Sequence, residues 1–130
     1  MPLSLPQVKP DVVVHAGGVI RDALLAQQTL AAFREVVAPK HYAALRLADL
    51  LWAQPAAAEI SFSSLSALLG TAGQANYAAA NQLLNVQAEL RQSQGRPCSA
   101  VSRKLAPRLA DVIVQSQKVF LRVGQIAIKQ

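Results

Sequence analysis

Cysteine, aromatic residues and charge are all scarce in this chain of 130 residues. The single cysteine, Cys98, allows no internal disulfide and no cysteine zinc cluster, so we expect a small buried residue there and no metal site. No apolar run reaches the roughly 18 to 20 residues that a membrane-spanning helix needs, and the amino-terminal stretch lacks the apolar core of a signal peptide. Composition therefore favours one globular domain without membrane contact, and a cytoplasmic location is the default expectation.

Positive charge is scarce in the body of the chain, although the formal net charge is +6. Residues 1–100 hold seven Lys or Arg against six Asp or Glu, whereas residues 101–130 hold six against one. A nucleic-acid-binding protein would show a basic stripe with aromatics or a groove-reading helix, and the body has neither. We therefore expect no nucleic-acid partner. We divide the chain into a linker (1–10), an α/β body (11–101) and a divergent basic tail of unknown order (102–130).

Three short runs in the body are typical of parallel strands. The β-branched run at 11–15 predicts a buried strand, and further strands are expected at 58–64 and 97–101. Glu59 and Ser61 are unusual in a central strand, although the alternation that they leave still gives one apolar face. Strands separated by helical segments favour an α/β fold with a parallel sheet.

Helical segments fill the gaps between these strands. Thr29 is expected to cap a helix that runs toward Pro39, and Lys40 is expected to begin a second helix of roughly 14 residues with one apolar stripe. A third helix should begin at about residue 76, and Gly95 should end it in the position that follows the last helical residue.

The segment from Ser61 to Gln87 is the one with a chemical pattern. A loop with Ser64 precedes a helix on which Tyr77 and Asn81 are four residues apart, a spacing that puts both on one face. This arrangement suits carbonyl chemistry, in which a hydroxyl that polarises an oxygen atom and a phenol that donates a proton must converge on that atom. By periodicity alone, the simpler interpretation of Tyr77 is a half-buried aromatic with its hydroxyl in water.

Other candidate residues also have simple structural interpretations. Gly17 and Gly18 follow the first strand, where glycines let a ligand approach the backbone, but they also suit a plain tight turn. Asp22 is an ordinary acidic residue at the start of a helix, and Lys40 taken alone is an ordinary surface lysine.

Three strings change these judgements: VVVHAGGVIRDALL, the APK at 38–40, and FSSLSALLGTAGQANYAAAN. Together they closely resemble the ketoreductase domain of modular polyketide synthases and animal-type fatty acid synthases. These ketoreductase domains are relatives of the short-chain dehydrogenases/reductases. The resemblance runs from about residue 11 to 101, and Lys40 lies 24 residues before Ser64 while Tyr77 lies 13 after it, as in the family. It implies a partial Rossmann-like, doubly wound parallel sheet that lacks its first half.

The resemblance also implies a catalytic set of Lys40, Ser64, Tyr77 and Asn81. Tyr77 would give a proton to the nascent alkoxide, and Ser64 would hydrogen-bond the substrate carbonyl. Lys40 would hold the cofactor ribose and favour the tyrosinate, and Asn81 would support the proton relay. The reaction would be NADPH-dependent reduction of a β-ketoacyl thioester, presented by an acyl carrier protein, to the β-hydroxyacyl thioester.

Two further groups of residues receive roles from the same resemblance. The cofactor would be contacted by Ala16, Gly17 and Gly18 beside the nicotinamide, together with Lys40 and Tyr77.

The stereochemistry would be set by Asp22, the second acid of a Leu-Asp-Asp triplet that is written Ile-Arg-Asp in this chain, and by Leu69. Leu69 stands eight residues before Tyr77, where the opposite class has a tryptophan, so we expect the D-configured hydroxyl.

Several family features are missing from the sequence. It contains no G-x-G-x-x-G turn for the cofactor phosphates, and after Ser102 it has neither the Trp-Gly motif nor the helical lid of the family. We therefore expect a carboxyl-terminal portion of a ketoreductase domain. The alternative is a non-catalytic structural or docking piece that needs a complementary ketoreductase half or a neighbouring synthase domain.

Overall fold

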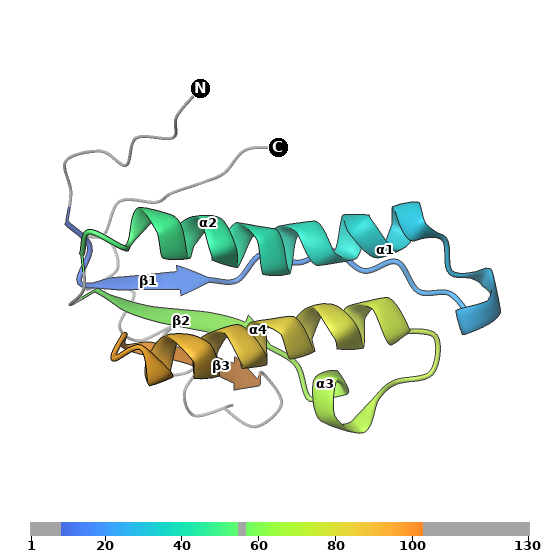
Figure 1. Ribbon diagram of the computed structural model, residues 1–130. Helices are drawn as coiled ribbons and strands as arrows, with labels where there is room; N and C mark the ends of the chain where they lie inside the picture. The colour runs from blue at the N-terminus through green and yellow to red at the C-terminus, as the bar shows by residue number, and fades with distance from the viewer. Residues whose placement is uncertain (1–8, 55–56, 103–130) are drawn as a thin grey trace, which may run out of the picture.

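The computed structural model describes residues 9–54 and 57–102. Within these ranges, one sheet contains three parallel strands in the order β1-β2-β3 (Figure 1). The strands are β1 (Val12–His15), β2 (Ala58–Ser63) and β3 (Cys98–Ser102). The predicted α/β class is confirmed, and the three strands fall where the sequence predicts them. The expected linker 1–10 and basic tail 102–130 lie largely outside the described residues.

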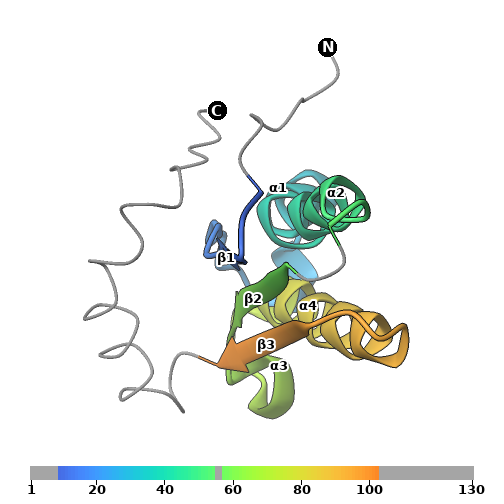
Figure 2. The same cartoon turned by 90° about the vertical axis from the view of Figure 1, so that its left-hand side faces the viewer.

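Helices connect consecutive strands, and the longer ones lie on one side of the sheet (Figure 2). They are α1 (Leu30–Val37), α2 (Ala43–Leu50), α3 (Ser66–Leu69) and α4 (Ala75–Ser93). Figure 2 shows α1, α2 and α4 packed against the same face of the sheet. None of the helices in the described part of the chain has the length and apolar character needed to cross a lipid bilayer.

The expected helix boundary at Pro39 and Lys40 is wrong. The chain stays helical from Leu30 to Leu50, because a π-helical turn, Ala38–Tyr42, joins α1 to α2. In an α-helix the proline ring clashes with the carbonyl group four residues earlier, and a widened turn relieves that clash. Pro39 is therefore accommodated inside a long helix instead of ending it.

Two local signals at helix ends behave as predicted. The hydroxyl of Thr29 accepts a hydrogen bond from the Ala32 N–H at 3.1 Å and so caps α1. Gly95 follows the end of α4 with φ of +73°, and the Arg96 N–H donates to the Arg91 carbonyl oxygen. This is the glycine-dependent ending of an α-helix, with the left-handed residue that lets the chain turn back toward β3.

The apolar core lies between α1 and α4. Val36, Val37 and Ala80 are buried there, and Tyr77 and Leu83 pack against them. The sheet face beneath the helices is more polar than this core.

Along β2, the buried residues that face the helices are Glu59, Ser61 and Ser63. Their neighbours Ile60 and Phe62 are half-buried and project to the opposite face. The strand thus places polar groups under α4 and leaves apolar groups on the side away from the described helices.

Candidate functional site

Lys40 is the centre of the site, because the π-helical turn directs its side chain inward. The side chain is only 4% exposed, and Nζ donates a hydrogen bond to the Phe62 carbonyl oxygen at 2.9 Å. Burial lowers the pKa of the Lys40 amine to about 8. A Cβ at Gly18 would lie 3.2 Å from Lys40 Cε, so a glycine at this position leaves room for the lysine stem.

Tyr77 lies in the first turn of α4 and faces Lys40. Lys40 Nζ lies 5.5 Å from the centre of the Tyr77 ring, within the range of a cation–π contact. The ring also packs against the cluster of Val36, Val37 and Ala80, which fixes its position between two helices. A cation and a phenol are thereby held side by side at the carboxyl end of β2.

Asn81 is one turn further along α4 and is completely buried, with 0% exposure. Its Nδ2 donates to the Tyr77 carbonyl oxygen at 2.7 Å, and the Ser63 hydroxyl donates to the Asn81 carbonyl oxygen at 3.2 Å. Asn81 Oδ1 is buried and has no hydrogen-bond partner among the described residues. This oxygen is an acceptor available to a water molecule or a bound ligand.

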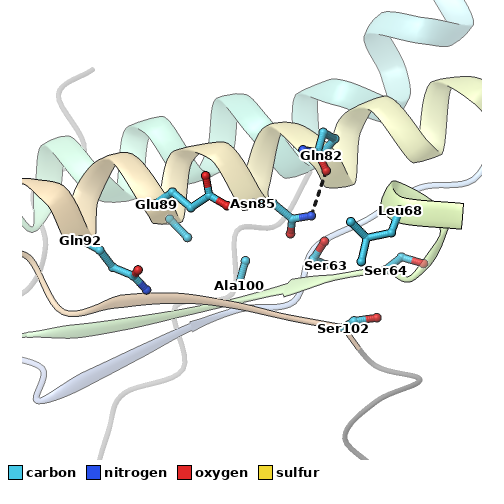
Figure 3. Close-up of a pocket in the computed structure, with 10 residues that line it drawn as sticks. Ser63, Ser64, Leu68, Gln82, Asn85, Glu89, Gln92, Ala100 and Ser102 are labelled. Atoms are coloured by element: carbon cyan, nitrogen blue, oxygen red, sulfur yellow. Dashed lines mark hydrogen bonds between the residues drawn. The ribbon is translucent and has the colours of Figure 1, made fainter.

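Ser64 follows the last residue of β2, and its contacts are local. Its hydroxyl oxygen lies 3.2 Å from the Ser66 N–H donor and 3.0 Å from the Ser66 hydroxyl. Ser64 lines a groove of about 370 Å³ between α4 and β3, together with polar side chains of α4 such as Gln82 and Asn85 (Figure 3). The structure thus brings Lys40, Tyr77 and Asn81 together. Convergence of Ser64 with Tyr77 on one carbonyl oxygen stays a prediction.

Ala16, Gly17 and Gly18 lie directly after β1 and are exposed. A Cβ at Gly17 would lie 3.1 Å from the Pro39 carbonyl oxygen and 3.2 Å from His15 Cε1. Both glycines therefore accommodate neighbouring parts of the chain itself. Because their backbone is also exposed, a ligand can still approach them at the carboxyl end of the strand.

Asp22 belongs to a loop that is tied to the start of α4. Both of its carboxylate oxygens accept hydrogen bonds from Gln74 Nε2 at 3.1 Å. The Ala23 N–H donates to the Gly73 carbonyl oxygen at 2.9 Å, which adds a backbone link between the same two loops. Leu69, at the end of α3, is 77% exposed. The two residues with predicted stereochemical roles are therefore both accessible.

Sequence reasoning missed two residues that build this site. Asn76 is buried, accepts a hydrogen bond from the Tyr77 N–H at 2.7 Å and donates to the Arg21 carbonyl oxygen at 2.8 Å. His15 is buried beneath the Lys40 carbonyl group. Asn76 could have been noticed as a capping-type residue beside Tyr77. His15 could have been noticed as a polar residue that ends an apolar strand.

Known proteins resemble this chain over most of the described residues. The family model of the KR domain matches residues 5–107. Polyketide synthase GfsA of Streptomyces halstedii is 44% identical over 90 residues, which cover 69% of this chain and 1% of that protein. A 6-methylsalicylic acid synthase of Arthrobotrys oligospora is 41% identical over 93 residues, which cover 72% of this chain and 5% of that protein.

Solved structures give the same result. The structure of an A-type ketoreductase from a modular polyketide synthase is 38% identical, with a TM-score of 0.67 over 70% of this chain and 19% of that one. The chain thus spans a small part of the relatives that it matches. A family match over these residues, relatives that are polyketide synthases and a shared Rossmann-like fold agree with one another. The chain belongs to the KR domain family, the ketoreductase domains of polyketide synthases.

Proposed function

We propose that this chain is a carboxyl-terminal portion of a ketoreductase domain that reduces a β-ketoacyl thioester to the β-hydroxyacyl thioester with NADPH. The observation that carries the proposal is the pair formed by Lys40 and Tyr77. The buried Lys40 ammonium lies 5.5 Å from the centre of the Tyr77 ring and is oriented by the Phe62 carbonyl oxygen. A buried cation beside a phenol is an arrangement suited to proton donation.

In this proposal Tyr77 donates its proton to the carbonyl oxygen of the substrate as that oxygen becomes negative. The positive charge of Lys40 attracts the negative charge that then develops on the phenolic oxygen, and low polarity around a buried group strengthens that attraction. Ser64 would hydrogen-bond the same carbonyl oxygen. Asn81 would support replacement of the lost proton through Oδ1, which is buried and has no hydrogen-bond partner in the described part of the chain.

The cofactor would supply hydride, since no protein side chain can. The residues present fit its nicotinamide and ribose half, because Lys40 has two further N–H donors beside the one used by Phe62 and because the backbone at Gly17 and Gly18 is exposed. The sequence contains no G-x-G-x-x-G turn for the phosphates. We therefore assign to this chain only contacts to the nicotinamide side, through Ala16, Gly17, Gly18, Lys40 and Tyr77.

A complementary half of the domain is the partner that we propose. The supporting observation is the sheet face opposite the helices, on which Val14, Ile60 and Phe62 are half-buried neighbours across β1 and β2. An apolar sheet face is usually covered in parallel α/β folds. The substrate would arrive on an acyl carrier protein of the same synthase.

The same face also supports a second candidate, a non-catalytic piece that docks on a complementary ketoreductase half or on a neighbouring synthase domain. In that case the apolar face would matter for assembly, and ketone reduction by the assembled protein would not depend on the Tyr77 hydroxyl. The two candidates differ in whether the assembled protein needs the phenol.

The test uses this chain assembled with an amino-terminal ketoreductase half and a small ketone such as a decalone as substrate. Reduction of the ketone is measured as the rate of NADPH oxidation. We expect Tyr77→Phe to lower kcat by about 10² to 10⁴, the usual contribution of a positioned proton donor. The matched control is Tyr42→Phe, because Tyr42 is 54% exposed on the outer side of the helix. Equal activity of Tyr77→Phe and the parent would refute the catalytic assignment and favour the docking piece.

A further inference from the structure

His15, the last residue of β1, reaches the turn that carries Lys40. Its Nε2 atom lies 3.0 Å from the Lys40 carbonyl oxygen, and the contact is buried. A carbonyl oxygen can only accept, so the imidazole donates from Nε2, and its neutral form at this position is the tautomer with hydrogen on Nε2. Burial lowers the pKa of His15, which keeps the imidazole neutral near neutral pH.

The turn that His15 contacts is the π-helical turn Ala38–Tyr42, with Lys40 at its middle. The Ala43 N–H reaches back to the Ala38 carbonyl oxygen, five residues earlier, and also to the Lys40 carbonyl oxygen that His15 contacts. Pro39 supplies no N–H to this turn. Single π-helical turns inside α-helices are rare and occur frequently at functional sites. A widened turn with one donor missing depends more on bonds from outside the helix than an ordinary helical turn does.

The position of the His15 ring is set by close packing as well as by this bond. A Cβ at Gly17 would lie 3.2 Å from His15 Cε1 and 3.1 Å from the Pro39 carbonyl oxygen. The absence of a side chain at Gly17 therefore leaves the space through which β1 and the π-helical turn approach each other. His15, Gly17 and Pro39 form one packed contact on the backbone side of Lys40.

We propose that His15 is a positioning residue for Lys40. Its bond to the Lys40 carbonyl oxygen holds the π-helical turn in the form that directs Lys40 Nζ to the Phe62 carbonyl oxygen and the Tyr77 ring. His15 acts through Lys40 and touches neither substrate nor cofactor. The predicted effect of His15 on ketone reduction rests on the proposed function. The placement of Lys40 does not, because it can be measured without cofactor or substrate.

The experiment compares His15→Leu, which removes the donor, with His15→Gln, whose amide N–H replaces it, in the full 130-residue chain. The matched control is Ser61→Ala, because Ser61 is the buried register partner of His15 on β2. Two quantities are measured by NMR: hydrogen exchange at the Ala43 N–H and the side-chain Hε and Cε signals of Lys40. We expect exchange at Ala43 to rise about tenfold in His15→Leu and to stay within about threefold of the parent in His15→Gln and Ser61→Ala.

The Lys40 side-chain signals should shift in His15→Leu and return in His15→Gln. Unchanged exchange and unchanged Lys40 signals in His15→Leu would overturn the inference. So would equal losses in the leucine and glutamine variants, or an equal loss in Ser61→Ala, because these results indicate general loosening of the sheet. A parent chain in which the Ala43 N–H exchanges without protection would contradict the turn itself.

A second variant tests the same contact from the other side. Gly17→Ala places a Cβ against the His15 ring, so we expect it to shift the Lys40 signals in the same direction as His15→Leu. In the assembled enzyme, His15→Leu should lower kcat with little change in KM for the ketone, and His15→Gln should restore it. An inactive parent assembly would count against the proposed function and would leave the exchange result on His15 standing.

Discussion

Arg91 Nε lies 3.4 Å from a carboxylate oxygen of Glu59, and the two side chains are only 7% and 1% exposed between α4 and β2. Neither of these two atoms has a hydrogen-bond partner among the described residues, so their attraction is one of charge without a well-formed hydrogen bond. Removing two charges from water is costly, and an ion pair with this geometry offsets little of that cost.

Breaking the pair should destabilise the fold more than removing it. Arg91→Met leaves the Glu59 carboxylate buried and unpaired, and we expect the free energy of unfolding to fall by about 3 to 5 kcal/mol. The double variant Glu59→Leu, Arg91→Met should recover most of that loss, because two apolar side chains then fill the space. Denaturant unfolding of the two variants and the parent measures both changes. A double variant as unstable as Arg91→Met would show that the pair itself is needed.

The cost of burying the Glu59 carboxylate should also be visible in the pH dependence of stability. Burial raises the pKa of Glu59 above its ordinary value of 4.5, and Arg91 opposes this only in part. A raised pKa in the folded protein means that the contribution of this group to stability is fully present below pH 4.5 and is lost as the pH rises through the folded value. The parent should therefore lose stability relative to Glu59→Gln as the pH rises above 4.5. A gain over the same range would contradict the direction of the shift.

Lys40 should titrate far below an ordinary lysine. Burial lowers its pKa from 10.5 to about 8, so the Cε signal of Lys40 should change with a midpoint near pH 8, and the assignment is checked with Lys40→Met. Tyr77 and His15 are the titratable side chains next to it and should be followed in the same experiment. Because folding favours the neutral amine, the contribution of Lys40 to stability increases as the pH rises from 8 to 10.5. A midpoint near 10.5 would show an exposed lysine.

Reduction by the assembled enzyme should fall as the pH rises through about 8, because the Lys40 ammonium then loses its charge. The measurement is the pH profile of kcat with the same ketone, compared between the parent assembly and the Lys40→Met assembly. A profile that is flat across this range in the parent would remove the charge of Lys40 from the mechanism.

The parts of the fold that sequence could predict are those determined by neighbours along the chain. Thr29 caps a helix and Gly95 ends one because each acts on backbone groups within a few residues. The i,i+4 spacing of Tyr77 and Asn81 likewise places them one turn apart on α4, where Asn81 Nδ2 donates to the Tyr77 carbonyl oxygen at 2.7 Å.

Contacts between distant segments could not be predicted in this way. Lys40 is buried only because a π-helical turn rotates it inward, and that turn depends on Pro39 and on a bond from His15, 25 residues earlier in the chain. Glu59 is unusual in a central strand, and the sequence does not show that its partner is Arg91 on α4. The direction of the Ser64 hydroxyl is decided by Ser66, and no periodic pattern indicates it.

The stereochemical prediction concerns a complete domain that carries these residues. Asp22 is exposed and held by Gln74, and the loop around it is fixed to the start of the Tyr77 helix. A fixed loop beside Tyr77, the proposed proton donor, is suited to select one face of the substrate carbonyl. We expect the D-configured hydroxyl, measured by chiral analysis of the product, and we expect Asp22→Ala to reduce the excess. A mainly L-configured product from the parent would contradict the assignment.

The chain by itself should not reduce ketones, although Lys40, Tyr77 and Asn81 are already assembled. Positioned groups accelerate a reaction only when donor and acceptor are held in register, and small misplacements cost orders of magnitude. In the proposed function this chain would contact only the nicotinamide side of the cofactor, and its sequence contains no G-x-G-x-x-G turn for the phosphates. NADPH should therefore bind weakly if at all, and the three residues would have no hydride to direct. The measurement is NADPH oxidation with a decalone, first on the isolated chain and then after addition of an amino-terminal half.

Activity of the isolated chain that disappears in Tyr77→Phe and persists in Tyr42→Phe would refute this prediction. Activity that appears only in the assembled pair, with the same dependence on Tyr77, would identify the missing cofactor contacts as the contribution of the partner.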